Sequence, residues 1–445
     1  MKRFSFFMIV LFILTIALNL SAQKYEIYQT ELENGLDVIV IHNPIVPLVT
    51  IEIDVRNGAY TEPPEFDGLS HLYEHMFFKA NKAIPSQEEY MERMRELGAI
   101  WNGTTSEERV NYFFTVPKDS LAAGLEFMYN AITAPLFLEE ELVKERPVVT
   151  GEYDRAESNP FFHLNREVDK KVWWKYYSHK NVIGDREVIL TTTPEKMRTI
   201  QERFYVPNNS ALILAGDITK DVGFELARKY FSSWKRGDDP FQKFKVPEHP
   251  PIQKSETVIV EKPVNAVTLM IRWQGPSVSK DPAATYAADV LSYILGQRTS
   301  QFYKNIVESG LAYTVNFSYY TLNYTGPITI FAQTSPQNFE ACKEAIFAEL
   351  NKIVSPDYFT DDQLKNAKTI LAINEQYARE RPSQFAHTVG FWWSVAGLDY
   401  YLNYIDNLKK VGRGDIQRFM TTYILNKPYV MGILLSPEMR QEMGL

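Results

Sequence analysis

The sequence predicts an α+β protein built from two homologous, duplicated α/β-sandwich domains, each a mixed sheet with helices packed on it. The main observation is that one order of strand-like and helix-like segments occurs twice in the 445 residues, at an offset of roughly 210–220 positions. Strand-like runs are followed by helices without a regular βαβ alternation, which favours sandwiches over a doubly wound sheet. A composition of 45% hydrophobic and 23% charged residues is typical of globular proteins.

The chain begins with a segment typical of a secretory signal peptide. Lys2 and Arg3 precede a nearly unbroken apolar run over residues 6–18, and small residues follow it up to Ala22. The alternative is an uncleaved membrane anchor, but a run of 13 residues (18 − 6 + 1) is shorter than the ~20 apolar residues that span a bilayer. We therefore interpret residues 1–22 as a signal peptide and expect an exported, periplasmic protein with no stable membrane span after cleavage.

Charge and cysteine content narrow the classes of function. Lys and Arg total 47 against 55 Asp and Glu, a net charge of −8, which argues against a nucleic-acid partner. The single cysteine, Cys342, excludes an intramolecular disulfide and a cysteine-based zinc cluster. A bound metal would need carboxylates and some of the seven histidines.

The repeated elements follow one another in matching order in the two halves. In the first half they are two strand-like runs within 37–55, a helix over 68–78, a strand after Gly98, a helix over 121–132, and a closing helix and strand over 203–218. Their counterparts are 257–273, 285–295, the strand after Gly310, 339–353 and 418–435. An ordinary α+β chain could show a similar order, but the matching glycines and closing strands favour duplication. The Pro-rich stretch 236–255 lacks periodicity and is predicted to link domains at 23–235 and 256–445.

The first half contains a short motif with the chemistry of a metal site. His71, Glu74 and His75 lie in the helix predicted over 68–78, in the order H-x-x-E-H. Residues four apart project from one helix face about one turn apart, so both imidazoles can reach one cation. Glu74 lies beside them, where it can take a proton from water. The alternative is a pair of helix histidines whose nitrogens are satisfied by hydrogen bonds.

A second, carboxylate-rich helix is predicted over 139–157. Glu145 and Glu152 are seven residues apart, close to two helical turns, so both side chains can face the same way. On the residues alone, a solvated charge run is the favoured interpretation. Pro147 between them removes a backbone hydrogen bond and can bend the helix.

These segments resemble the pitrilysin or insulinase-like zinc metallopeptidases. The resemblance rests on HLYEH, on ERPVVTGE 70–77 residues after His75, on IGDREVILTTTPEKMRTIQERF and on YVPNNSALILAGDI, and the duplicated halves cover nearly the whole mature chain. The length is similar to the short-chain branch, which includes bacterial and mitochondrial processing peptidases. The resemblance implies one Zn²⁺ per chain held by His71, His75 and Glu152, with Glu74 as general base and Glu145 as the carboxylate that orients the site.

The resemblance also implies residues that bind substrate. Asn102 and Gly103 correspond to an edge strand to which a peptide adds as a further strand, although on the residues alone they are ordinary turn residues. Tyr313 matches a tyrosine that helps hold substrate near the zinc. The arginine that often precedes it is missing, because those positions are Ile306 and Val307. A partner chain could supply the missing cation, or Tyr313 could be a core tyrosine.

We therefore expect a zinc metalloendopeptidase that hydrolyses extended peptides or unfolded proteins. The resemblance implies that two short chains form a four-domain clamshell, so one chain is half of it and forms a homodimer or a heterodimer with a related chain. The alternative is a non-catalytic or partner-dependent subunit of a heteromeric peptidase.

Overall fold

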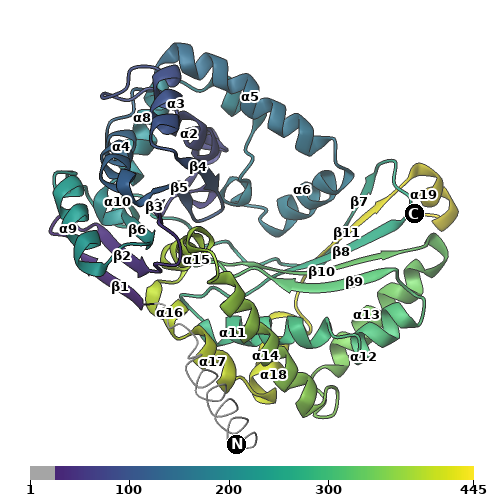
Figure 1. Ribbon diagram of the computed structural model, residues 1–445. Coiled ribbons are helices and arrows are strands. Elements are labelled where there is room, and N and C mark those ends of the chain that lie inside the picture. Colours follow the sequence, from purple (N-terminus) through teal and green to yellow (C-terminus); the bar gives the residue numbers. More distant parts are fainter. Residues whose placement is uncertain (1–25) are drawn as a thin grey trace, which may run out of the picture.

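The computed structural model describes residues 26–445, which form two sheets with helices packed on them (Figure 1). The predicted signal peptide and the first residues of the predicted first domain lie outside the described residues. Within residues 26–445, none of the helices is both long and apolar enough to cross a bilayer.

The first sheet has six strands in the order β1-β2-β6-β3-β5-β4. The strands are β1 (Glu26–Glu31), β2 (Asp37–His42), β3 (Leu48–Val55), β4 (Ile100–Thr105), β5 (Val110–Pro117) and β6 (Ser210–Gly216). The closing strand β6 is parallel to β2 and antiparallel to β3, so the sheet is mixed. Strand β4 pairs only with β5 in this sheet and therefore lies at its edge.

The second sheet repeats this topology in the order β7-β11-β8-β10-β9, without a counterpart of β1. Its strands are β7 (Glu256–Glu261), β8 (Val267–Gln274), β9 (Thr314–Tyr319), β10 (Pro327–Thr334) and β11 (Val430–Leu435). The closing strand β11 is parallel to β7 and antiparallel to β8, as β6 is to β2 and β3. Gly98 and Gly310 have φ of 63° and 82°, and each precedes an edge strand. The predicted α+β class with two alike mixed sheets is confirmed.

Helices cover both sheets (Figure 1). In the first half they are α2 (Leu69–Phe77), α3 (Gln87–Glu96), α4 (Leu121–Thr133), α5 (Glu139–Glu157), α6 (Pro160–Val172), α7 (Arg186–Thr191), α8 (Pro194–Phe204), α9 (Lys220–Phe231) and α10 (Pro240–Lys243). In the second half they are α11 (Pro282–Leu295), α12 (Gln301–Tyr303), α13 (Phe339–Lys352), α14 (Asp361–Ala378), α15 (Pro382–Val395), α16 (Leu398–Leu402), α17 (Tyr404–Lys410), α18 (Arg413–Tyr423) and α19 (Pro437–Met443). The stretch predicted as a linker, 236–255, contains α10 and otherwise no helix or strand.

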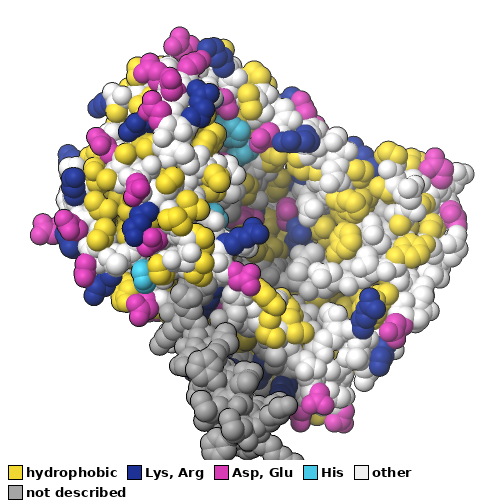
Figure 2. Space-filling model, in the orientation of Figure 1, with side chains coloured by type: hydrophobic (Ala, Val, Ile, Leu, Met, Phe, Trp, Pro, Cys, Tyr) yellow, Lys and Arg dark blue, Asp and Glu magenta, His cyan; other side chains and the backbone are white. Residues whose placement is uncertain are grey.

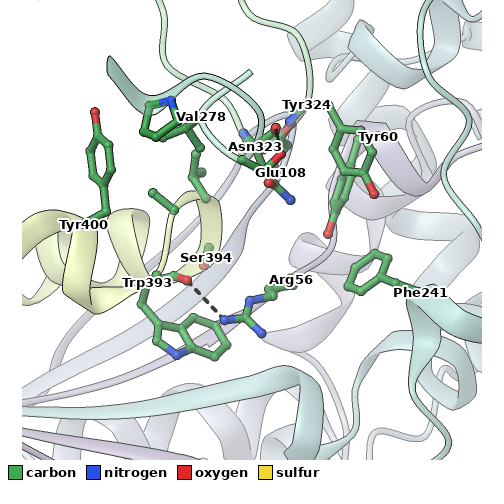
Figure 3. Close-up of a pocket in the computed structure, with 15 residues that line it drawn as sticks. Arg56, Tyr60, Glu108, Phe241, Val278, Asn323, Tyr324, Trp393, Ser394 and Tyr400 are labelled. Atoms are coloured by element: carbon green, nitrogen blue, oxygen red, sulfur yellow. Dashed lines mark hydrogen bonds between the residues drawn. The ribbon is translucent and has the colours of Figure 1, made fainter. Parts of the chain in front are cut away.

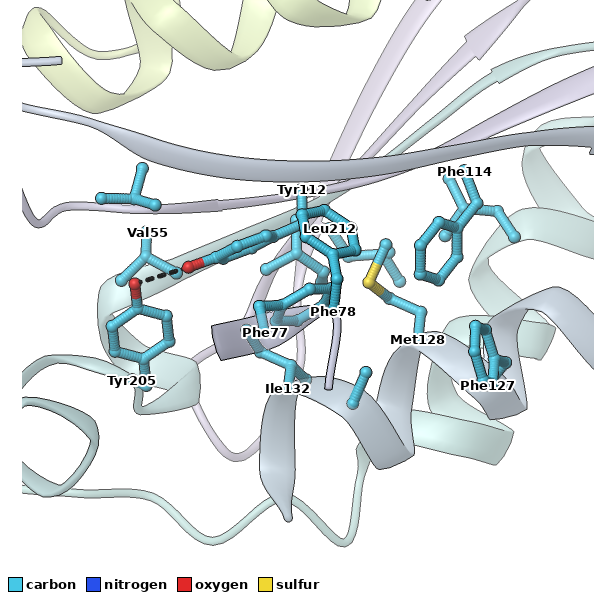
Figure 4. Close-up of a cluster of buried hydrophobic side chains, with 14 of the residues drawn as sticks. Val55, Phe77, Phe78, Tyr112, Phe114, Phe127, Met128, Ile132, Tyr205 and Leu212 are labelled. Carbon is cyan, nitrogen blue, oxygen red and sulfur yellow. Dashed lines mark hydrogen bonds between the residues drawn. The ribbon is translucent and has the colours of Figure 1, made fainter. Parts of the chain in front are cut away.

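Helix α2 is held by an aromatic core beneath the first sheet (Figure 4). The ring of Phe77 stacks on Tyr112 of β5 with 3.7 Å between centroids. The hydroxyl groups of Tyr112 and Tyr205 are hydrogen-bonded at 2.8 Å. Because Leu72, Tyr73, Met76 and Phe77 are buried, the helix is fixed with its histidine face turned away from this core.

The two halves exchange helices. Helix α6 of the first half packs its buried Leu164, Val168 and Val172 on Met270, Val430 and Leu434 of the second sheet. Helix α15 of the second half packs Phe385, Val389 and Trp393 on Ile39, Ile41 and Ile213 of the first sheet. The two helices start at Pro160 and Pro382, 222 positions apart (382 − 160), so the exchange follows the internal duplication. Each sheet therefore depends on a helix of the other half to bury one of its faces.

Candidate metal centre

Helix α2 presents two imidazoles to one carboxylate of α5. The rings of His71 and His75 lie 5.0 Å apart at 85°, as expected for residues one helical turn apart. Glu152 Oε2 lies 3.4 Å from Nε2 of His71 and 3.6 Å from Nε2 of His75. One ligand atom from each of these three residues lies within 4.8 Å of the other two.

These separations fit ligands of a shared cation better than they fit hydrogen bonds. A nitrogen–oxygen distance of 3.6 Å is too long for a hydrogen bond. Tetrahedral zinc with bonds of ~2.0–2.2 Å separates its ligand atoms by roughly 3.4 Å. Two imidazole nitrogens and one carboxylate oxygen also form a donor set that catalytic zinc sites use, leaving one position open. The residues present therefore fit a zinc ion.

Helix α5 continues through Pro147 and brings both predicted carboxylates to the histidines. Its bounds, Glu139–Glu157, are those predicted. Pro147 cannot donate the usual backbone hydrogen bond, and Thr150 on the next turn donates its hydroxyl to the carbonyl of Arg146 at 3.0 Å. The two-turn spacing of Glu145 and Glu152 is thus retained despite the proline.

Glu145 orients His75. Its Oε1 accepts a hydrogen bond from Nδ1 of His75 at 2.8 Å, and its Oε2 pairs with Nζ of Lys79 at 2.5 Å. Burial opposes ionisation of Glu145, but the hydrogen bonds from His75 and Lys79 keep its pKa below the ordinary value. Because Nδ1 of His75 carries the donated proton, the lone pair of Nε2 is directed toward Glu152.

The two histidines have different electrostatic environments. Burial, followed by the neighbouring His75, lowers the pKa of His71 to about 4, which leaves its imidazole neutral at neutral pH. Burial would also lower the pKa of His75, but its hydrogen bond with Glu145 and the surrounding carboxylates raise it above the ordinary value. A neutral imidazole is the form that binds a metal.

Glu74 lies between the histidines and the edge strand. Thr105 of β4 donates its hydroxyl to Oε2 of Glu74 at 2.6 Å. Burial raises the pKa of Glu74, and the hydrogen bond from Thr105 opposes that rise. A Cβ at Gly103 would lie 2.9 Å from Cγ of Glu74, so the strand backbone is in contact with this carboxylate. The sequence prediction did not include Thr105 or Lys79. No spacing rule links Thr105 to the motif, whereas Lys79 lies four residues after His75, a spacing that could have indicated it.

A cavity of about 410 Å³ contains these groups. Among its lining residues are the five predicted metal-site residues, with Trp101, Asn102 and Gly103 of β4. The face of the molecule in Figure 2 is hollowed between the two halves, with histidine side chains at its upper edge near the place of α2 in Figure 1. The site therefore opens beside β4, the edge strand of the first sheet among residues 26–445.

Tyr313 is not brought to this cavity. It precedes β9 in the second half, its amide donates to the carbonyl of Gln333, and it is not among the residues that line the cavity. Its side chain is 66% exposed, which excludes the core-tyrosine alternative. Ile306, at a position of the missing arginine, is fully buried in the second core.

Comparison with known proteins places these features in a family. Residues 37–185 match the model described as insulinase (peptidase family M16), and residues 191–371 match the one described as the peptidase M16 inactive domain. This chain belongs to peptidase family M16. It is therefore a member of the insulinase-like group that its motifs resemble.

Individual M16 relatives cover most of the chain. An uncharacterized zinc protease of Rickettsia felis is 26% identical over 379 residues, which span 83% of this chain and 87% of the relative. The uncharacterized zinc protease YmxG of Bacillus subtilis is 25% identical over 338 residues, 76% of this chain and 80% of the relative.

Solved structures share the fold of this M16 chain. A protease from Helicobacter pylori superposes with a TM-score of 0.82 at 22% identity, covering 92% of this chain and 100% of that one. The periplasmic protease PqqL of Escherichia coli gives 0.77 at 17% identity, covering 96% of this chain and 49% of that one. The present chain thus corresponds to about half of PqqL.

Proposed function

We propose that this M16 chain is a zinc-dependent metalloendopeptidase that cleaves extended peptides or unfolded proteins. The observation that supports it best is the convergence of His71, His75 and Glu152, with their ligand atoms within 4.8 Å of one another, beside a half-buried carboxylate at a sheet edge. Zinc-protease names among the relatives agree with that chemistry.

In this proposal each residue of the site has one task. Zinc, when bound by His71, His75 and Glu152, would supply a Lewis acid that activates water and polarises a peptide carbonyl. Glu74 takes the proton from the attacking water and delivers it to the leaving amine. Thr105 holds the Glu74 carboxylate through its 2.6 Å hydrogen bond. Glu145 keeps His75 in the tautomer that has Nε2 free.

The substrate backbone is proposed to add to strand β4. Its outer edge is not paired in the sheet formed by the described residues, and such an edge binds peptides of many sequences through main-chain hydrogen bonds. Asn102 is exposed on this strand, and Gly103 lets a peptide approach Glu74. The rings of Trp101 and Phe78, 4.6 Å apart, provide an apolar surface beside the site.

The assembly proposed is a pair of such chains, either a homodimer or a heterodimer with a related chain. Tyr313 lies outside the metal cavity of its own chain but is exposed, so Tyr313 of one chain could reach the metal cavity of the other. The 49% coverage of PqqL supports the idea that this chain is one half of a larger enclosure. We also propose that the chain is exported to the periplasm. Its two domains are proposed to span residues 23–235 and 256–445.

The test combines metal content with one substitution in the full mature chain. We expect about one zinc per chain by mass spectrometry, cleavage of a fluorogenic unfolded peptide, and loss of cleavage with zinc retained in Glu74→Gln. Glu140→Gln, an exposed carboxylate on α5, serves as the control and should cleave normally. A Glu74→Gln protein as active as wild type would contradict the base assignment. Zinc binding with no cleavage unless a second chain is added would favour the partner-dependent subunit.

A further inference from the structure

A second cavity lies between the two halves of the chain, away from the metal centre. It has a volume of about 560 Å³, within the range of small-molecule sites. Arg56, Tyr60 and Glu108 of the first half and Trp393, Ser394 and Tyr400 of the second contribute to its walls (Figure 3). None of its lining residues lines the metal cavity.

Arg56 brings a cation to this cavity. Its guanidinium stacks over the Trp393 ring at 4.1 Å from the centroid and donates to the Trp393 carbonyl at 3.3 Å (Figure 3). In the described part of the chain, no carboxylate forms an ion pair with it. Burial lowers its pKa, and the opposing effects of Tyr60 and of the Asp37 and Asp239 carboxylates do not cancel that shift. Its remaining N–H groups are available to a ligand.

Ser394 provides a second polar group without a partner. Its side chain is 7% exposed, and Oγ makes no hydrogen bond to any of residues 26–445. A buried hydroxyl without a partner costs free energy, and an anion bound beside it would remove that cost. Arg56 and Ser394 come from different halves, so a ligand that binds both groups would bridge the halves.

Aromatic residues form one part of the remaining walls. The Tyr60 ring lies 5.7 Å from that of Phe241 and 5.6 Å from that of Tyr324. These tilted contacts join three aromatic rings into one apolar part of the wall.

The one carboxylate in the lining, Glu108, is already engaged. It accepts hydrogen bonds from the backbone N–H groups of Asn323 at 2.6 Å and Tyr324 at 3.0 Å. Its presence beside a single guanidinium disfavours a doubly charged anion such as phosphate, whose second charge would stay unpaired.

We propose that this inter-half cavity binds an organic monocarboxylate that carries an aromatic ring, with the carboxylate on Arg56 and Ser394 and the ring against Tyr60 and Phe241. The chemistry is that of a free aromatic acid and equally of the C-terminal residue of a peptide. This binding does not depend on the proposed peptidase activity, because the two sites share no lining residue.

The test is calorimetric titration of the full chain with matched ligands. N-acetyl-L-phenylalanine should bind at least about tenfold more tightly than N-acetyl-L-phenylalaninamide, because the amide lacks the charge that Arg56 binds. N-acetylglycine, which has the carboxylate but no ring, and inorganic phosphate should both bind more weakly. The peptide Ala-Ala-Phe distinguishes a peptide C-terminus from a free acid as the ligand. If it binds more tightly than N-acetyl-L-phenylalanine, the ligand is the C-terminus of a peptide. If it binds more weakly, the ligand is a free aromatic acid.

Two variants and a control link the binding to named residues. Arg56→Gln should lower the affinity for N-acetyl-L-phenylalanine by about tenfold or more, since a charged hydrogen bond is lost. Arg95→Gln, an exposed arginine on α3, should leave the affinity unchanged. Ser394→Ala, which removes one oxygen, should weaken binding even if Arg56→Gln fails to fold. Three results would overturn the proposal. The first is equal affinity for the acid and the amide, and the second is no binding to the wild-type chain at 10 mM ligand, about ten times a Kd of 1 mM. The third is unaltered binding in both Ser394→Ala and Arg56→Gln.

Discussion

Gly103 and Glu74 are in direct contact across the boundary between strand β4 and helix α2. A Cβ built on Gly103 would lie 2.9 Å from Cγ and 3.2 Å from Oε1 of Glu74. A side chain at position 103 would therefore displace the carboxylate. The close approach couples the position of the edge strand to the position of the proposed general base.

Replacing Gly103 should impair turnover while leaving metal binding intact. In Gly103→Ala the added methyl group pushes Glu74 from its place, and a misplacement of about 1 Å can reduce kcat/KM by about 100-fold. Zinc content should not change, because Gly103 contributes no ligand. Gly414→Ala is the control, since a Cβ there meets nothing within 4 Å. Full activity of Gly103→Ala in a peptide assay would contradict the contact.

Glu145→Gln should weaken zinc binding. The substitution removes the charge that holds His75 by a 2.8 Å hydrogen bond, and loss of such a partner typically reduces metal affinity by about 10–100-fold. Competition with a chelator of known affinity measures the change. Glu140→Gln on the same helix is the control and should bind zinc as wild type does. Equal zinc affinities of the two variants in the chelator titration would contradict the role of Glu145 in the site.

Glu108 should make the stability of the chain depend on pH. Its pKa is raised from 4.5 to about 7, chiefly by burial. Between these values the folded chain holds a proton that the unfolded chain has lost, so the free energy of unfolding falls as pH rises from about 5 to 7. Urea denaturation at pH 5 and pH 8 should show a smaller difference for Glu108→Gln than for wild type. The exposed Glu225→Gln should behave as wild type, and identical pH dependence in all three proteins would be contrary to this account.

Truncation of Leu164 should destabilise the whole chain. Leu164 on α6 is fully buried against the second sheet, and Leu→Ala at such sites costs about 2–5 kcal/mol. The position of the helix is tight, because a Cβ at Gly432 of β11 would lie 2.6 Å from Leu164 Cδ1. Leu190→Ala, where the side chain is 44% exposed, is the control. A loss of about 0.5 kcal/mol or less in urea denaturation, which is what a surface change usually gives, would argue against the helix exchange.

Local periodicity accounts for what the sequence predicted well. The H-x-x-E-H spacing places His71 and His75 on one helix face whatever the rest of the chain does, and the structure has them there. The repeated order of elements predicted two alike sheets, which the two strand orders confirm. Glu152 could be joined to the histidines only through the family resemblance, because no local rule relates two helices 70 residues apart.

Long-range packing accounts for what the sequence did not predict. The apolar residues of α6 and α15 mark amphipathic helices but do not identify the sheet each one covers. His387, which has no partner spacing in sequence, donates Nδ1–H to Glu52 of β3 at 2.5 Å because α15 crosses to the first half. Arg56 and Trp393 meet for the same reason. Such contacts follow from the exchange of helices, not from any pattern within one segment.

Anomalous diffraction at the zinc edge, from crystals of the full mature chain, would locate the metal directly. We expect a peak with bonds of ~2.0–2.2 Å to Nε2 of His71, Nε2 of His75 and a carboxylate oxygen of Glu152. A zinc-loaded crystal whose peak lies elsewhere, or that leaves Glu152 outside bonding distance of the metal, would contradict this expectation.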